Sequence, residues 1–312
     1  MSHFYLLTGG AGFIGSNIVR RLVEEQKPVR VLDNFATGKR DNLEGLDRLE
    51  VMEGSLSVDS DVRRALDGVE YVLHQGAVPS VPRSVADPVG SNEANVGGTV
   101  NLLAAAKEAG VKRVVFAASS SAYGDTEVLP KVEDMASDPL SPYAVSKYAG
   151  ELYARVFSLV YELPTVSLRY FNIFGPCQDP ASEYAAVIPK FIKLMLKGES
   201  PTIYGDGEQT RDFTFVENAV NANLLACESD RVGSGEVINV ACGTRFSLNE
   251  LVECLNDILG TKIKPKYAPP RPGDVLHSQA DISKARELLG YEVKVDFKEG
   301  LRRTVEWYRQ ND

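Results

Sequence analysis

Short apolar runs of β-favouring residues alternate with helical stretches over the first half of the chain. The runs predict strands at residues 4–8, 29–33, 49–53, 71–74, 114–117 and 165–168. Apolar residues recur at helical spacing in the stretches 13–22, 62–66, 92–109 and 143–161. Alternation of this kind is typical of a parallel sheet whose strands are joined by right-handed helical crossovers. The pattern therefore predicts a Rossmann-type, doubly wound α/β fold.

The regular alternation of strand and helix patterns ends after about residue 169. Pro and Gly become denser from there on, and a second loop-rich stretch lies around residues 265–273. We therefore expect residues 1–169 to form the Rossmann domain that binds a cofactor. Residues 170–312 are expected to form mainly a smaller, mixed α/β domain that binds the substrate. The apolar run Val237–Val240 is typical of a buried strand, so residues 213–242 are expected to return to the first sheet.

Composition and charge narrow the class of protein. The chain is 44% hydrophobic and 25% charged, as in ordinary globular proteins. Its net charge of −9 disfavours a nucleic-acid or anionic-membrane partner. The four cysteines include no C-x-x-C pair and have no histidine at metal-ligand spacing, and no apolar stretch reaches the ~20 residues of a membrane helix. We expect a cytoplasmic protein with reduced thiols and no metal.

The strongest chemical signal is a glycine turn between the first strand and the first helix. Gly9, Gly12 and Gly15 are spaced three residues apart. Such a turn brings backbone N–H groups and the positive end of the helix dipole against a pyrophosphate. Asp33 ends the second strand 18 residues after Gly15, where a carboxylate can accept both ribose hydroxyls and repels a 2′-phosphate. The combination indicates NAD rather than NADP, although such an aspartate can also be only a helix cap.

A tyrosine and a lysine four residues apart form the candidate catalytic pair. Tyr143 and Lys147 follow a proline that favours a helix start, so both side chains share one helix face. A phenol with a pKa near ~10 is a weak base at neutral pH, and a neighbouring ammonium together with a nicotinamide cation would stabilise its phenolate. Tyr143 is therefore a candidate proton acceptor. Ser119, Ser120 and Ser121 follow a strand at the edge where ligands bind in open α/β sheets.

Taken together, these motifs resemble those of the extended short-chain dehydrogenase/reductase family. The resemblance covers essentially the whole chain and is carried by the segments Thr8–Gly15, Asp33–Asn34, His74–Ala77, Asn95–Thr99, Ser119–Gly124, Tyr143–Lys147, Arg169–Pro176, Gly205–Gly207, Arg211–Phe213 and Arg271–Asp274. Within that family the sequence is most similar to UDP-hexose 4-epimerases, and among them to UDP-N-acetylglucosamine 4-epimerases. The resemblance implies NAD as cofactor and inversion at C4 of a UDP-hexose through a transient 4-keto sugar. The expected substrates are UDP-GlcNAc and UDP-GalNAc, with UDP-glucose and UDP-galactose as further ones. It also implies a homodimer in which the helices at residues 92–109 and 143–161 pair between two copies.

The resemblance assigns roles to individual residues on the cofactor side. Tyr143 would act as the base, Lys147 would hold the nicotinamide ribose, and Ser119 would bridge the base and the sugar O4. The other residues expected to contact NAD are Gly9, Gly12, Phe13, Ile14, Gly15, Asp33, Asn34, Thr37, Gly38, Ser55, Leu56, Gly76, Ala77, Asn95 and Tyr170. Ser55 is a departure from the family, because relatives often carry an aspartate there that binds the adenine amine. In this chain the Ser55 hydroxyl would form the hydrogen bond to the adenine instead.

On the substrate side, the resemblance implies that two arginines hold the diphosphate. Arg211 and Arg271 can each form bidentate bonds to phosphate, although either could also be a surface ion-pair residue. The further expected substrate contacts are Ser80, Ser120, Ser121, Asn172, Ala186, Val187, Tyr204, Asp274 and Ser278. A small residue at Ser278 would leave space for an N-acetyl group at C2 of the sugar, although Ser278 could also be only a loop residue.

Other functions remain open at this point. A nucleotide-sugar 4,6-dehydratase of this family carries an Asp-Glu pair beside the active hydroxyl, where this chain has Ser120 and Ser121. A UDP-glucuronate 4-epimerase or decarboxylase needs only one more Arg or Thr to bind the C6 carboxylate. A non-catalytic NAD(H)-sensing protein is disfavoured, because such proteins commonly lack the tyrosine and the lysine.

Overall fold

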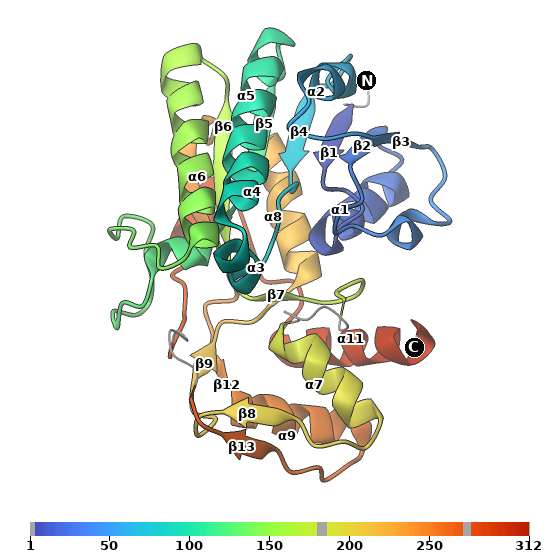
Figure 1. The fold of residues 1–312 in the computed structure, drawn as a ribbon, viewed down its shortest axis with the longest axis vertical. Helices are drawn as coiled ribbons and strands as arrows, with labels where there is room; N and C mark the ends of the chain where they lie inside the picture. The colour runs from blue at the N-terminus through green and yellow to red at the C-terminus, as the bar shows by residue number, and fades with distance from the viewer. Residues whose placement is uncertain (1–3, 180–185, 271–275, 312) are drawn as a thin grey trace.

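Seven parallel strands form the central sheet of the larger lobe in the computed structural model, which describes residues 4–179, 186–270 and 276–311 (Figure 1). The strand order is β11-β6-β5-β4-β1-β2-β3. The chain runs outward in both directions from β1 and β4, and ligands bind at this point in doubly wound sheets. The Rossmann-type fold class predicted from the sequence is confirmed. The strands are β1 (Tyr5–Thr8), β2 (Val29–Asp33), β3 (Leu49–Glu53), β4 (Tyr71–His74), β5 (Arg113–Ser119), β6 (Thr165–Tyr170) and β11 (Ser234–Val240).

Helices cover both faces of this sheet. α5 and α6 contact each other on one face, and α1 packs against α8 on the other. Tyr5 and Leu7 of β1 join the hydrophobic cluster that contains α1 and α8, whereas Leu6 joins the cluster of α5 and α6. The strands β1, β2 and β6 are buried on both faces, which explains their apolar runs, whereas the edge strand β3 is partly exposed. The helices of this lobe are α1 (Phe13–Glu24), α2 (Asp59–Ala65), α3 (Val81–Ala86), α4 (Pro88–Asn92), α5 (Gly98–Glu108), α6 (Pro142–Tyr161) and α8 (Val216–Glu228), with 3-10 turns η1 (Arg40–Leu43) and η3 (Ser120–Tyr123).

The helical stretch predicted at residues 92–109 is helical in the structure but not α-helical throughout. Glu93–Gly97 (η2) forms one π-helical turn between α4 and α5. In this turn the Asn95 side chain accepts a hydrogen bond from the Val78 N–H (2.7 Å) and donates one to Ser146 Oγ (3.0 Å). The predicted helical stretch is confirmed, and its π turn contains the residue whose amide bonds both a loop and α6. Turns of this kind often accompany functional sites.

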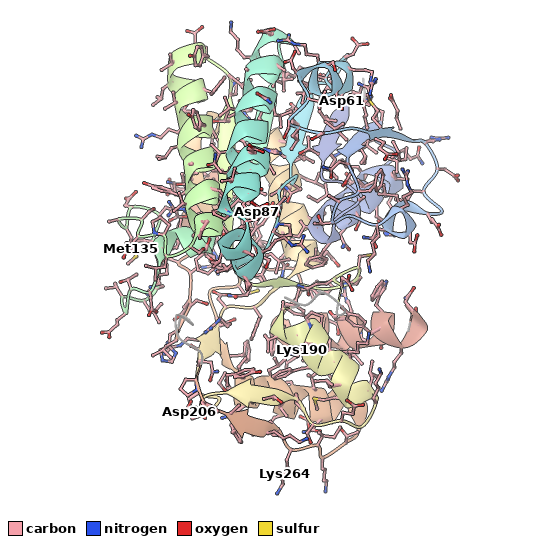
Figure 2. The ribbon with its side chains drawn as sticks, viewed as in Figure 1. Asp61, Asp87, Met135, Lys190, Asp206 and Lys264 are labelled. Carbon is pink, nitrogen blue, oxygen red and sulfur yellow. The ribbon has the colours of Figure 1, made fainter. Side chains whose placement is uncertain are left out.

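The smaller lobe is built from short strand pairs and helices (Figure 1). Its outer surface carries Asp206 and Lys264, and Lys190 lies on α7 (Figure 2). The strand pairs are β8 (Thr202–Tyr204) with β13 (Lys266–Ala268), β9 (Thr210–Arg211) with β12 (Phe246–Ser247), and β7 (Ile173–Phe174) with β10 (Thr214–Phe215). The helices of this lobe are α7 (Val187–Leu196), α9 (Leu248–Leu259) and α11 (Phe297–Asn311). A further helix, α10 (Ser283–Leu289), packs against β11 and α8 of the larger lobe. Within the described residues, no helix combines the length and apolar character that a membrane span requires.

Apolar packing is continuous between the two lobes. The Phe174 ring in β7 lies edge-on to Phe215 and Phe297, with ring centroids 5.7 and 5.8 Å apart. β11 follows part of the smaller lobe in the sequence, yet it pairs with β6 in the large sheet. The chain thus crosses between the lobes more than once, and the two sides of the cleft between them are held by one hydrophobic core.

Candidate active site

A cavity of about 590 Å³ opens at the carboxyl ends of the central strands. Every residue predicted to contact the cofactor lines this cavity except Asn95. Predictions made from motifs spread between Gly9 and Tyr170 therefore meet at one place. The lining also contains residues that the sequence did not single out, among them Lys39, Gln75, Cys177 and Asp179.

The glycine turn has the close backbone packing that its sequence predicts. Gly9 has a φ of +68°, and a Cβ atom at Gly15 would lie 2.2 Å from the carbonyl oxygen of Gly9. Side chains are therefore excluded at both positions. Gly12 precedes α1 without any side-chain cap, and the first turn of α1 lines the cavity. The N–H groups of this helix start are suited to an anionic group such as a pyrophosphate.

Asp33 is held rigidly at the end of β2. It is buried, with Oδ2 accepting a hydrogen bond from the Ala11 N–H (2.9 Å) and Oδ1 accepting one from the Phe35 N–H (2.8 Å). Each oxygen keeps a lone pair for a further donor. Gly38 packs against Ala11, and the Lys39 N–H donates to the Ala11 carbonyl (3.0 Å). The arrangement fits the two hydroxyls of an adenosine ribose and opposes a 2′-phosphate.

Ser55 has its own hydrogen-bond arrangement in place of the aspartate common in relatives. Its Oγ accepts from the Ser57 N–H (3.2 Å), and its N–H donates to Oδ2 of Asp61 (3.0 Å), a residue in the first turn of α2 that Figure 2 labels. The hydroxyl proton of Ser55 is therefore the group that can reach a cofactor atom in the cavity.

The start of α6 fixes the position of Tyr143. The Ser141 Oγ accepts from the Ala144 N–H (3.1 Å), and the Ser84 Oγ accepts from the Tyr143 N–H (3.0 Å). These two caps satisfy N–H groups that a helix start otherwise leaves without a partner. Tyr143 and Lys147 lie one turn apart on α6, and both line the cavity.

Burial controls the protonation of this pair. The Lys147 Nζ donates to the carbonyl oxygen of Ala117 (2.9 Å), and burial lowers the pKa of Lys147 to about 8. Burial also raises the pKa of Tyr143, although a hydrogen bond with Ser119 acts in the opposite direction. The phenol is thus protonated near neutral pH until positive charge beside it stabilises the phenolate. Lys147, one turn further along α6, is the candidate for part of that charge.

Ser119 is the member of the serine run that acts on Tyr143. Its Oγ accepts from the Ser121 N–H (3.2 Å) and from the Ser121 hydroxyl (2.8 Å). Two donors already point at this oxygen, so the Ser119 proton is directed elsewhere, toward the phenol. Ser119, Ser120 and Ser121 lie outside the cavity lining, and Ser119 is linked to the cavity through Tyr143.

Asn95 lies beneath the site rather than in it. It is 3% exposed, and its amide bonds the Val78 main chain and Ser146 Oγ. The Ser146 hydroxyl in turn donates to the Tyr143 carbonyl oxygen (2.8 Å). Through these bonds Asn95 supports the catalytic helix. Its direct contact with the cofactor stays a prediction.

Two further polar side chains stabilise the floor of the cavity. His74 is buried between the hydroxyls of Thr8 (2.7 Å) and Thr99 (2.9 Å), and burial lowers the pKa of His74 to about 3. The Tyr170 hydroxyl accepts from Asn223 Nδ2 (2.7 Å), and burial raises its pKa to about 12. Both groups are uncharged at neutral pH, so neither adds a charge to the site.

The structure places the predicted substrate residues in different parts of the chain's fold, and some of them are joined by hydrogen bonds. Ser80 lines the cavity itself, with a φ of 95° at the cap of α3. Asn172 Nδ2 donates to the Asp212 carbonyl oxygen (3.1 Å) and to Ser278 Oγ (3.2 Å). Arg211 Nη1 donates to the carbonyl oxygens of residues 210 and 276, each at 3.0 Å.

The remaining predicted substrate residues are more dispersed. Ala186 and Val187 stand at the start of α7, and Tyr204 ends β8. Together with Asn172, Arg211 and Ser278, they lie outside the lining of the large cavity. Arg271 and Asp274 fall outside the described residues, so the predicted pairing of two arginines on a diphosphate has a described position only for Arg211.

An ion pair at the cavity was not predicted from the sequence. Lys39, in the loop after β2, lies 3.0 Å from Asp179, in the segment after β7. Both residues line the cavity, one from each side of the cleft. No local pattern marks either residue, because the pair exists only through the packing of two distant segments.

A dinucleotide cradle beside a buried Tyr143–Lys147 pair defines the molecule as an enzyme of the short-chain dehydrogenase/reductase type. Residues 5–241 match the family model described as the NAD dependent epimerase/dehydratase family. The chain belongs to this family, and NAD is its cofactor.

Similar proteins cover the chain from end to end. It is 39% identical to the UDP-glucose 4-epimerase of Mycolicibacterium smegmatis, over 97% of this chain and 98% of the relative. Among solved structures it is similar to the UDP-N-acetylglucosamine 4-epimerase of Methanobrevibacter ruminantium in complex with UDP-N-acetylmuramic acid, with 43% identity, full coverage of both chains and a TM-score of 0.95. The UDP-glucose 4-epimerase of Thermus thermophilus in complex with NAD is 38% identical over 98% of this chain and 99% of its own, with a TM-score of 0.89.

Proposed function

We propose that the protein is a UDP-hexose 4-epimerase that interconverts UDP-GlcNAc and UDP-GalNAc, with UDP-glucose and UDP-galactose as secondary substrates. The observation that carries this proposal is the group formed by Tyr143, Lys147 and Ser119 at the edge of the cofactor cavity. In this assignment the larger lobe binds NAD and the smaller lobe binds the UDP-sugar.

In the proposed reaction, Tyr143 takes the proton from the 4-hydroxyl of the sugar. NAD, when bound, supplies reversible transfer of the hydride at C4. Ser119 hydrogen-bonds the phenol and favours its deprotonated form. In this assignment the ammonium of Lys147, one helical turn away, favours the phenolate further when NAD is bound. The 4-keto sugar then turns about its diphosphate linkage and presents its other face. Tyr143 returns the proton, so no net oxidation results.

The substrate proposal depends on the space near Ser278. Its small side chain is half-buried, and its hydroxyl accepts from Asn172 Nδ2 at 3.2 Å. A bulky side chain in this place would occupy the volume that an acetamido group needs. The similarity to an epimerase solved with an N-acetylated UDP-sugar supports the same preference.

We also infer that two copies of the chain pair through α5 and α6. Apolar side chains project from the outer side of α6, and Leu152, Val156 and Leu159 are 45, 44 and 63% exposed. Their spacing places them on one helix face. A second copy, related by a twofold axis, presents the same stripe and can cover this one.

The test is turnover of three substrates without added reductant. Purified protein is incubated separately with UDP-GlcNAc, UDP-glucose and UDP-glucuronate, and the products are resolved by chromatography or NMR. A higher kcat/KM for UDP-GlcNAc than for UDP-glucose is the expected result, and Ser278→Tyr should remove that preference while keeping turnover of UDP-glucose. Turnover of UDP-glucuronate alone would replace this proposal with a uronate epimerase or decarboxylase. Bound NAD without turnover of any of them would favour a sensing role.

A further inference from the structure

A buried aspartate connects the two lobes beside the substrate side of the cleft. Asp212 is 0% exposed and lies between β9 and β10. Its carboxylate accepts three backbone hydrogen bonds, from the N–H groups of Cys242 (3.0 Å), Gly243 (3.0 Å) and Ala280 (3.1 Å). Cys242 and Gly243 follow β11 of the large sheet, whereas Ala280 lies two residues after Ser278. One side chain thus joins the end of a central strand to the segment that carries Ser278.

The main chain of Asp212 reaches the same segment by a second route. Its carbonyl oxygen accepts from Asn172 Nδ2, which also donates to Ser278 Oγ. Asn172 has a φ of 38°, a left-handed conformation that asparagine tolerates better than most residues. The Ser278 N–H donates to the carbonyl oxygen of Thr210, two residues before Asp212. Asn172, Asp212 and Ser278 are therefore parts of one closed set of contacts.

We propose that Asp212 is a positioning residue that sets the space around C2 of the sugar, by holding the Ser278–Ala280 segment against the end of β11. This inference rests on the proposed function, because that function assigns Ser278 to this space. Asp212 itself lies outside the lining of the cavity that holds Tyr143 and Lys147. Its influence on the reaction therefore passes through the substrate pocket and leaves the proton-transfer residues in place.

The chemistry of the contacts requires a carboxylate. Three donors approach Asp212, and its two oxygens offer enough lone pairs for all of them. An asparagine of the same size has one acceptor oxygen, and its NH₂ group would face backbone N–H groups. Asp212→Asn therefore keeps the volume and breaks the connection. Burial raises the pKa of Asp212 to about 7 even though the three N–H groups favour its charge, so measurements belong at about pH 8, where the side chain is ionised.

The decisive measurement compares two substrates in Asp212→Asn. We expect KM for UDP-GlcNAc to rise at least about fivefold relative to KM for UDP-glucose, with kcat within about threefold of wild type and bound NAD unchanged. If Asp212 supported only the fold, its replacement would lower the fraction of active protein. Turnover of both substrates would then fall by the same factor, and the ratio of their KM values would stay unchanged. Asp296→Asn is the matched control, because the Asp296 side chain accepts a hydrogen bond from the Glu299 N–H (2.9 Å), which the amide oxygen of asparagine can also accept. Equal effects on both substrates would overturn the inference.

A double-mutant cycle tests the route of the effect. If Asp212 acts through the Ser278 segment, Asp212→Asn and Ser278→Ala combine with less than the sum of their separate effects on the substrate ratio. Additive effects would show that Asp212 acts elsewhere. Ala280→Pro removes one donor and leaves the carboxylate, so it tests the same connection if Asp212→Asn does not fold.

A binding measurement distinguishes failure of the proposed function from failure of the inference about Asp212. Calorimetric titration of UDP-GlcNAc and UDP-glucose measures binding without turnover. If wild-type protein binds both nucleotides but epimerises neither, the proposed function is wrong, while a changed ratio of the two affinities in Asp212→Asn still supports the inference. An unchanged ratio would contradict it in either case.

Discussion

The Nζ atom of Lys147 lies 2.9 Å from the carbonyl oxygen of Ala117, at the end of β5 beside the cofactor cavity. This bond anchors a buried cation to the central sheet one helical turn from Tyr143. The position of the positive charge is thus determined by a strand and a helix together, and its effect on the phenol can be measured.

Lys147→Met should move the pH dependence of the reaction. Loss of the ammonium removes a charge that stabilises the phenolate, so the pKa of Tyr143 rises and the ascending limb of kcat/KM shifts to higher pH. The profile is measured with UDP-GlcNAc on protein loaded with NAD. Lys112→Met, which changes an exposed lysine paired with Glu70, is the control. An unshifted profile would contradict the role given to Lys147.

Tyr143→Phe should remove the proton acceptor and little else. We expect kcat to fall roughly 100-fold to 10,000-fold, the usual effect of losing a positioned acid–base group. Affinity for UDP, measured by calorimetry, should stay close to wild type, because the proposed nucleotide contacts come from the smaller lobe. Tyr148→Phe changes a tyrosine on the same helix and should leave kcat unaltered. Full activity in Tyr143→Phe would exclude this tyrosine as the base.

His74 should make the fold sensitive to mild acid. The folded pKa is about 3 and the unfolded value is near ~6.5, so below that value only the unfolded chain binds the proton. Stability from this group is complete above about pH 6.5 and is lost as the pH falls toward 3. Between about pH 7 and about pH 5 the loss amounts to about 2 kcal/mol.

The measurement is urea unfolding of wild type and His74→Gln at both pH values and one protein concentration. The variant should be less stable at about pH 7, because glutamine replaces one of two threonine contacts poorly, but its stability should fall less between the two pH values. Equal losses in both proteins would assign the acid sensitivity to other groups.

Charge on the outer face of α6 should separate the two copies. Val156→Lys combined with Leu159→Lys places two ammonium groups in the stripe, where a twofold-related copy would bring them against their equivalents. Light scattering after size exclusion should then report a monomer. Val58→Lys, at a valine 45% exposed outside this stripe, should leave the oligomeric state unchanged. A wild-type monomer would contradict the inferred dimer.

The sequence predicted the large sheet well because most of its strands are buried and therefore stand out as short apolar runs. Residues 29–33, 49–53 and 71–74 were predicted as strands with the bounds that β2, β3 and β4 have. The cofactor site was also predictable, since the glycine turn and the Tyr143–Lys147 pair are each contained in a few consecutive residues. Such local patterns report backbone conformation directly.

Features made by distant segments were not predictable in this way. The Lys39–Asp179 pair and the three bonds to Asp212 depend on how loops from both lobes pack, which no spacing records. Asn95 shows the same limit within one helix. Its apolar neighbours repeat at ordinary helical spacing, while the π turn that removes it from the cavity arises from its bonds to Val78 and Ser146.

Because β11 pairs with β6, the central sheet cannot be fully assembled until β11 has been synthesised. β6 leaves the ribosome long before Ser234–Val240, so during synthesis its outer edge has no neighbouring strand while much of the smaller lobe is being made. An open edge of this kind favours pairing with other chains. A fragment that ends after β6 would keep that edge permanently, and the NAD-binding lobe is therefore expected to need the later part of the chain to remain unaggregated.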